Sequence, residues 1–93
     1  MVNHPNRSKR HTPGPWYVER DGGSPYILDS EKLYRVADVV SFHPSADARL
    51  IAAAPDLLDV ARMLIEVNDA AEPRFTFRDC VMRARAAVAR TEG

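Results

Sequence analysis

A proline inside an apolar block constrains the fold of this chain more than any other feature. Residues 48–58 read Ala-Arg-Leu-Ile-Ala-Ala-Ala-Pro-Asp-Leu-Leu and form the longest apolar block of the sequence. Inside a helix, proline removes a backbone N–H donor and clashes with the preceding turn, whereas at a helix start it is tolerated. The block therefore predicts two helices that meet at a corner. Pro55 opens the second helix, and Asp56 complements the positive end of its dipole.

The residues before the corner have the pattern of an antiparallel sheet. Asp-Gly and Gly-Gly steps within residues 21–24 supply the positive φ values that tight hairpins need. A second turn falls at residues 30–32, and an alternating pattern typical of the longest strand follows at residues 33–41. We therefore predict a three-stranded antiparallel β-meander within residues 15–42.

The residues after the meander have helical periodicity. Ser45 is the predicted N-cap of the first helix, and Thr76 with Asp79 resembles a capping box for the last one. The predicted helices span about residues 46–54, 55–70 and 76–91. Their apolar stripes contain Leu57, Val60, Ala61 and Leu64, widened by Leu58 and Ile65, in the middle helix, and Phe77, Cys80, Val81, Ala84, Ala87 and Val88 in the last. The prediction is an α+β fold whose N-terminal meander packs on a short helix and a C-terminal antiparallel helix pair.

Length and composition indicate one domain with segregated charges. The chain has 93 residues, enough for a single domain, which we place at residues 12–93 after a flexible basic arm at residues 1–11. Its single cysteine, Cys80, excludes an internal disulfide, and no apolar run approaches the roughly 18 residues of a membrane span. We therefore expect a cytoplasmic protein. Acids concentrate in residues 45–72 and arginines in residues 73–93, a segregation that favours self-association or docking on a charged partner.

The sequence contains no pattern typical of a catalytic or metal site. His43 has no Cys, His or Glu at metal-ligand spacing, so we assign it a corner or capping role. Cys80 lies on an apolar helix stripe, where a buried structural thiol is the commoner role. We therefore expect no enzyme activity, no metal and no cofactor.

Arg49 is the first candidate for contact with a ligand. It is the one charge inside the apolar block, near backbone N–H groups of a helix start that favour anions. Its alternative role is a salt bridge to a nearby acid such as Asp47 or Asp56. The candidate set is completed by Trp16, Arg35 and His43. For Trp16, the only tryptophan, the alternative to stacking on a ligand is burial in the core.

Two motifs, taken together and in this order, resemble those of known proteins. They are Thr-Pro-Gly-Pro-Trp at residues 12–16 and the apolar block at residues 48–58. In both, the chain resembles a widespread group of small, uncharacterised phage and prophage proteins. That group usually has Asn where this chain has Asp47. The resemblance implies an accessory protein of a phage or integrated element, acting in the bacterial cytoplasm.

This context suggests a function without catalysis. We predict a counter-defence factor, a homodimer or higher oligomer, that binds a host immune protein or sequesters a small anionic ligand of nucleotide type. In outline, a small sheet followed by two helices is similar to some phage sponges that trap cyclic nucleotide messengers. The alternative is an accessory protein that binds nucleic acid through the basic arm and the arginine-rich last helix. No membrane partner is expected.

Overall fold

Three short strands and three helices follow one another along the chain. The structure, a computed structural model, describes residues 10–93, so the predicted arm at residues 1–11 lies outside it except for its last two residues. The elements are β1 (Tyr17–Glu19), β2 (Tyr26–Leu28), β3 (Arg35–Asp38), α1 (Pro44–Ala52), α2 (Ala54–Asp69) and α3 (Phe77–Glu92). The strands pair antiparallel in the order β1-β2-β3. The predicted α+β fold with an N-terminal antiparallel meander is confirmed.

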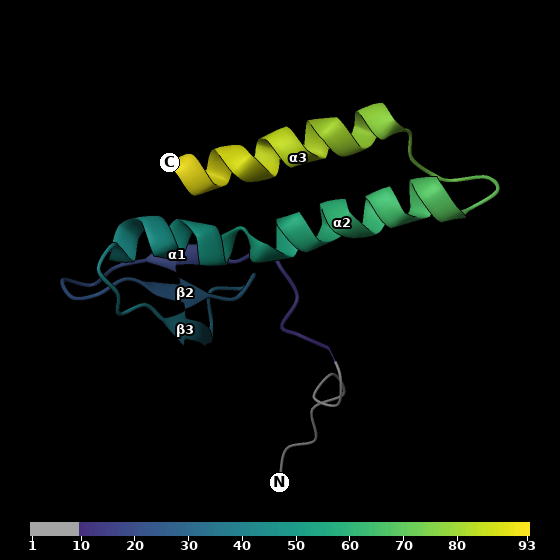
Figure 1. The fold of residues 1–93 in the computed structure, drawn as a ribbon. Coiled ribbons are helices and arrows are strands. Elements are labelled where there is room, and N and C mark those ends of the chain that lie inside the picture. The colour runs from purple at the N-terminus through teal and green to yellow at the C-terminus, as the bar shows by residue number, and fades with distance from the viewer. Residues whose placement is uncertain (1–9) are drawn as a thin grey trace, which may run out of the picture.

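The elements are stacked in three tiers (Figure 1). The sheet forms one tier, α1 and α2 lie almost end to end in the next, and α3 runs back antiparallel over both. Strands β1 and β2 contact α1, whereas no strand contacts α2 or α3 within the described residues. Helix α1 is therefore the element that joins the sheet to the helix pair.

The core between the sheet and α1 is built from one large side chain and several small ones. Ile27 of β2 is completely buried, as is Ala48 of α1, and Val39 and Ala52 are nearly so. Trp16 packs against this cluster and is half-buried. Alanines on the inner face of α1 let its backbone approach the sheet closely, so a small core can still exclude water.

The third strand is shorter than the sequence predicts. The alternation at residues 33–41 suggested one long strand, but β3 covers only Arg35–Asp38. The carboxylate of Asp29 accepts hydrogen bonds from the backbone N–H groups of Leu33 (2.8 Å) and Tyr34 (3.3 Å). These two residues therefore belong to the turn, because their donors are used by a side chain and not by a strand.

The predicted N-cap of the last helix is found in the structure, whereas the predicted N-cap of the first helix is not. Thr76 and Asp79 form the predicted capping box, with N–H···O distances of 3.1 and 2.8 Å. The prediction that Ser45 caps the first helix was wrong, since α1 begins at Pro44 with His43 in the N-cap position. Proline lacks an N–H and has a fixed helical φ, so it fits the first helical position.

The corner between α1 and α2 contains no loop. Ala53 is both the C-cap of α1 and the N-cap of α2, with φ −82° and ψ −7°, and Pro55 occupies the first turn of α2. The backbone N–H of Ala53 donates to the Arg49 carbonyl at 3.1 Å. A single residue thus separates the two helices, and their axes change direction there (Figure 1).

Candidate functional site

The N-terminal segment packs directly on the helix corner. Gly14 lies against Pro55 so closely that a Cβ atom added to it would be 2.5 Å from the Pro55 Cβ. Beside it, the indole Nε1 of Trp16 donates to the carbonyl of Thr12 at 3.1 Å, which closes this segment into a tight turn. The two sequence motifs at residues 12–16 and 48–58 therefore meet in one junction, and a glycine is required where they touch.

Arg90 of α3 fastens this junction. One guanidinium nitrogen donates to the carboxylate of Asp56, and the other donates to the backbone carbonyl of Trp16 at 2.7 Å. Both charged side chains are about one-third exposed, at 35% and 36%. Asp56 therefore does more than complement the dipole of α2, because it joins the corner to the last turns of α3.

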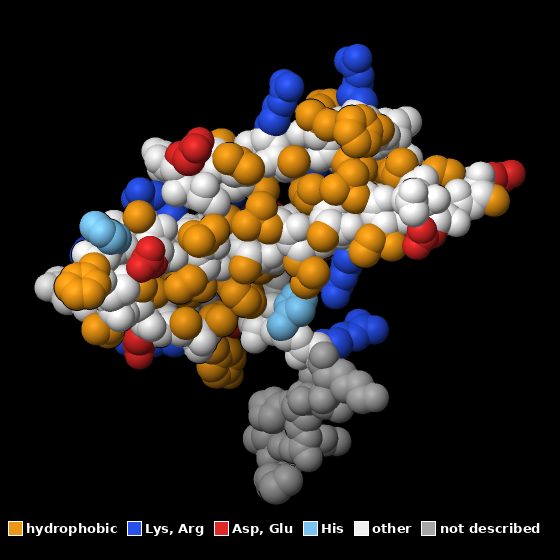
Figure 2. All heavy atoms as spheres, viewed as in Figure 1, with side chains coloured by type: hydrophobic (Ala, Val, Ile, Leu, Met, Phe, Trp, Pro, Cys, Tyr) orange, Lys and Arg blue, Asp and Glu red, His pale blue; other side chains and the backbone are white. Residues whose placement is uncertain are grey.

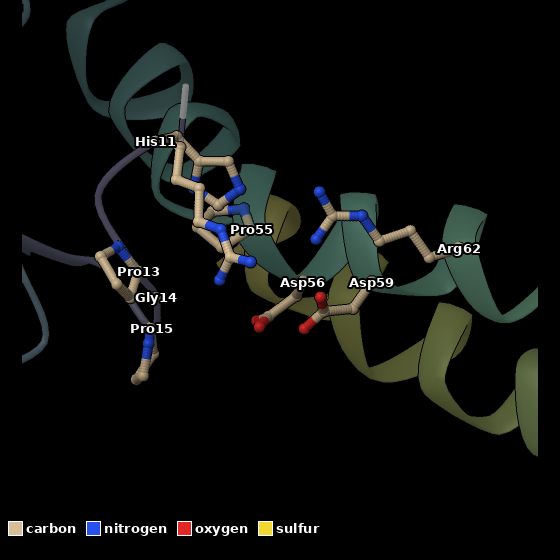
Figure 3. A pocket seen from close by; sticks show the side chains of 9 residues that line it. His11, Pro13, Gly14, Pro15, Pro55, Asp56, Asp59 and Arg62 are labelled. Atoms are coloured by element: carbon tan, nitrogen blue, oxygen red, sulfur yellow. The ribbon is translucent and has the colours of Figure 1, made fainter. Parts of the chain in front are cut away.

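An open cleft of about 590 Å³ lies beside the junction. Its walls come from the N-terminal segment on one side and the first turns of α2 on the other (Figure 3). The lining residues are Arg10, His11, Pro13, Gly14, Pro15, Pro55, Asp56, Asp59 and Arg62. Basic and acidic side chains thus border one cavity together with three prolines, an arrangement suited to holding a polar group against an apolar surface.

The charges of the cleft are arranged along α2. Asp56, Asp59 and Arg62 follow one another at three-residue spacing, which places them on one side of the helix. In Figure 3 the two carboxylates point to the same side, and His11 lies over Pro55. Within the described residues, Asp56 is paired with Arg90, whereas no ion pair is found for Asp59. Asp59 and Arg62 are the charged groups of α2 left to contact a bound molecule.

The arginine predicted to contact a ligand is used inside the fold. Arg49 is half-buried on α1, and its Nε donates to the Thr91 carbonyl near the end of α3 at 3.4 Å. A salt bridge to Asp47 or Asp56 does not form within the described residues, because the side chain points toward α3. The negative end of the α3 dipole is a favourable place for this cation.

The other predicted site residues lie apart from one another. Trp16 packs against the core, with the ring of His11 edge-on at 6.4 Å. Arg35 lies on the outer face of the sheet, 3.9 Å over the Tyr26 ring, and pairs with Asp38 at 2.9 Å. His43 is exposed at the start of α1. None of these three, nor Arg49, lines the cleft.

Sequence reasoning missed Arg10, His11, Asp59 and Arg62 as cleft residues. The spacing of the charged residues on α2 was a usable signal, since it placed them on one side of the helix. What no spacing could reveal is that the N-terminal segment packs against this side of α2. That contact depends on Gly14 and Arg90, which are distant from α2 in sequence.

The two sides of the α2–α3 pair differ sharply. One side, which we call the charged side, carries Asp59, Arg62, Glu66 and Arg74 next to Arg83 of α3. There the Arg74 Nε donates to Glu66 Oε1 at 3.0 Å, and its backbone N–H donates to Glu66 Oε2 at 2.7 Å. These hydrogen bonds hold the pKa of Glu66 below its usual range and raise that of Arg74. The opposite side is apolar (Figure 2).

Two further features bear on the class of site. Within residues 10–93, no group of three His, Cys, Asp or Glu side chains is close enough together to hold a metal ion. In the same residues, every helix is too short or too polar to cross a membrane.

The fold and the site define a class: small α+β proteins in which an N-terminal segment packs on a proline helix corner and leaves a charged cleft beside it. The particular family follows from sequence comparison. A family model described as Salmonella phage P22 protein Y8K6 matches residues 6–93, so the chain belongs to this family. The predicted relation to small phage proteins is confirmed at that level. No match was found among curated proteins or among solved structures.

Proposed function

We propose that this phage protein is a non-enzymatic accessory factor that counteracts a host defence by binding a host protein in the bacterial cytoplasm. The observation that carries the proposal is the cleft between the N-terminal segment and α2, with charges of both signs along one wall. A cleft of this kind holds a partner through paired charges and backbone contacts, and needs no reacting group.

The charge of the cleft favours a polypeptide over a small anion as its occupant. Arg10, His11 and Arg62 would attract an anion, but the carboxylate of Asp59 borders the same space. Within an open cleft of this size, an anion placed near Arg62 would also be repelled by Asp59. A protein segment carries both charges and can satisfy both walls. Sequestration of a nucleotide-type ligand is therefore the second form of the proposal.

The test is a comparison of two charge reversals on exposed helix positions. The full-length protein, its Arg62→Glu variant and its Arg85→Glu variant are each purified from the bacterial host under infection. Arg62 lines the cleft, whereas Arg85 is an exposed residue of α3 that does not line it, and both substitutions change the net charge equally. We expect one host protein to co-purify with the unmodified chain and with Arg85→Glu, and to be lost with Arg62→Glu.

Mass spectrometry of material released on denaturation completes this experiment. A nucleotide released in place of a protein partner, and lost in Arg62→Glu, would replace the first form of the proposal with the second. If neither a protein nor a small anion depends on Arg62, the cleft is not the binding site and the proposal fails.

Nucleic acid is the alternative partner, and part of the positive charge it would need is already used within the fold. Of the five arginines in residues 73–93, Arg74 is paired with Glu66 and Arg90 with Asp56. These two charges are therefore compensated within the fold, whereas Arg78, Arg83 and Arg85 of α3 are exposed and have no ion pair within the described residues. The arm residues 1–9, the other part of that alternative, lie outside the described residues.

A further inference from the structure

The α2–α3 pair has an apolar side that no other part of the described chain covers. Buried residues on the facing sides of the two helices include Val60, Met63, Cys80 and Ala87. A second set of apolar residues lies about a quarter turn away on each helix. We call this set the apolar face: Leu57, Ala61 and Leu64 of α2 with Phe77, Val81, Ala84 and Val88 of α3. Figure 2 looks onto this side, where hydrophobic side chains gather between the two helices.

The spacing of the apolar face is that of a helix-bundle core. Its positions on α2 are separated by four and three residues, and those on α3 by four, three and four. This is the a/d pattern with which helices supercoil around one another. Because the helices are antiparallel, a quarter turn in the same sense on each brings both stripes to the same side of the pair. The face thus has the spacing that half of a four-helix bundle core has.

The exposed apolar surface of the face is large enough to mark an interaction site. Phe77 is 67% exposed, Val88 45% and Leu64 41%, and at the border of the face Ile65 is 60% exposed and Leu50 54%. Together these side chains present apolar surface on the order of 500 Å². That is about the apolar part of what each partner contributes to a stable homodimer. No charged residue lies among the seven residues of the face.

We propose that the apolar face binds the same face of a second copy of this chain, forming a dimer with a four-helix core. A four-helix core consists of two such antiparallel helix pairs that face each other with the same spacing. A second copy of this chain supplies the second pair, so we take it as the occupant. A twofold axis through the face supplies it with no further element. The mixed-charge cleft lies on the charged side, away from this axis, since Arg62 and Asp59 belong to both.

The dimer goes beyond the proposed function and does not depend on it. It carries two clefts on its outer surfaces, so a partner that is itself a dimer or an array would meet two sites at once. Such a partner would be bound more tightly than through one cleft, without any new contact. Sequence reasoning predicted self-association from the charge pattern. The structure assigns it instead to an apolar surface that contains no charge.

The test is the mass of the full chain in solution, measured by size-exclusion chromatography with light scattering over a range of concentrations. Two variants place a charge in the face, Leu64→Glu and Phe77→Glu. The matched control is Leu33→Glu, because Leu33 is 67% exposed, the same value as Phe77, but lies in the turn before β3 and on neither helix of the pair. Residue 77 is the first residue of α3, where a negative charge interacts favourably with the positive end of the helix dipole. We therefore expect the Phe77→Glu variant to keep its fold.

We expect twice the chain mass for the unmodified protein and for Leu33→Glu, and the single mass for both face variants with unchanged helical circular dichroism. A monomer at every concentration would overturn the proposal. So would a dimer that survives in both face variants, since it would use another surface. A monomer that binds a different protein through Phe77 would also overturn it, because the occupant would then not be a second copy.

Discussion

The guanidinium group of Arg90 pairs with the carboxylate of Asp56 and so joins the last turns of α3 to the first turn of α2. The same guanidinium holds the Trp16 carbonyl, which belongs to the N-terminal segment. Three parts of the chain far apart in sequence are therefore connected at one side chain, next to the cleft.

Replacing Arg90 with Met is expected to destabilise the protein by about 1–2 kcal/mol, since it removes a charge-assisted pair and a hydrogen bond that are only partly exposed to solvent. Urea denaturation measures the loss. Arg83→Met is the matched control on the same helix, because Arg83 has no ion pair within the described residues and is exposed. Equal losses in the two variants would show that the contacts of Arg90 contribute nothing.

The double variant with Asp56→Asn tests whether the two residues act together. If they do, the loss in Asp56→Asn/Arg90→Met is smaller than the sum of the two single losses, because the pair can be broken only once. Additive losses would mean that Arg90 stabilises the fold through Trp16 alone.

Gly14→Ala is expected to separate the N-terminal segment from the corner. The new Cβ would be 2.5 Å from the Cβ and 3.0 Å from the Cγ of Pro55, and a buried proline ring cannot move aside easily. A cost of about 1–3 kcal/mol is typical of such overpacking. Trp16 fluorescence, which should shift to longer wavelength, and urea denaturation follow the change. In Gly23→Ala the new Cβ meets no atom within 4 Å, so that variant should match the unmodified chain.

The Glu66–Arg74 pair is expected to make the stability of the α2–α3 connection depend on pH. Hydrogen bonds from Arg74 lower the pKa of Glu66 in the folded state. Their contribution to the stability of the folded state is therefore complete above the ordinary pKa of glutamate, about 4.3. It is lost as the pH falls through the lowered pKa of Glu66. An NMR titration of the Glu66 carboxyl carbon should give a midpoint below the ordinary one. In Arg74→Gln the midpoint should return toward it, and an unchanged midpoint would contradict the assignment.

Thr76→Ala is expected to cost about 1 kcal/mol, the usual effect of losing an N-cap side chain. The hydroxyl accepts the backbone N–H of Asp79 at 3.1 Å, and without it that donor faces water alone. Thermal unfolding followed by circular dichroism measures the effect. Thr76→Ser keeps the hydroxyl and should recover most of the stability. A serine variant as unstable as the alanine variant would point to the methyl group of Thr76.

The sequence was a good guide wherever the cause of a structure is local. The corner at Pro55 and the capping box at Thr76 depend on neighbouring residues only, and both were predicted. The turn at residues 21–24 likewise has Gly22 at φ +96°. Ser45 failed as a cap because Pro44 before it also suits a helix start. The prediction compared side-chain caps and overlooked the fixed φ of proline.

The packing of the helices could not be predicted from their apolar stripes. Helix α2 has apolar residues around most of its circumference, and any third of them could have faced α3. The structure buries Val60 and Met63 and leaves Leu64 and Ile65 exposed. The contact of Arg49 with α3 could not be predicted for a similar reason, because its partner is a backbone carbonyl, and carbonyls carry no signal in a sequence. Tertiary packing determines which residues of a helix face its neighbour, and it depends on residues far apart in the sequence.

Because α2 does not contact the sheet in the described part of the chain, we expect two parts of the molecule to differ in their free energy of local unfolding. One part is the turn-side half of the helix pair, and the other is the sheet with α1. Within the described residues no strand contacts α2 or α3, so the turn-side half of the helix pair can unfold while the sheet, α1 and the junction at Arg90 remain folded. Amide protons near Glu66 and Cys80 should exchange with solvent sooner than those of Ile27 and Ala48. Pairing with a second chain would cover this weaker half. Hydrogen exchange there would then slow as the protein concentration rises, and exchange in the sheet would not change.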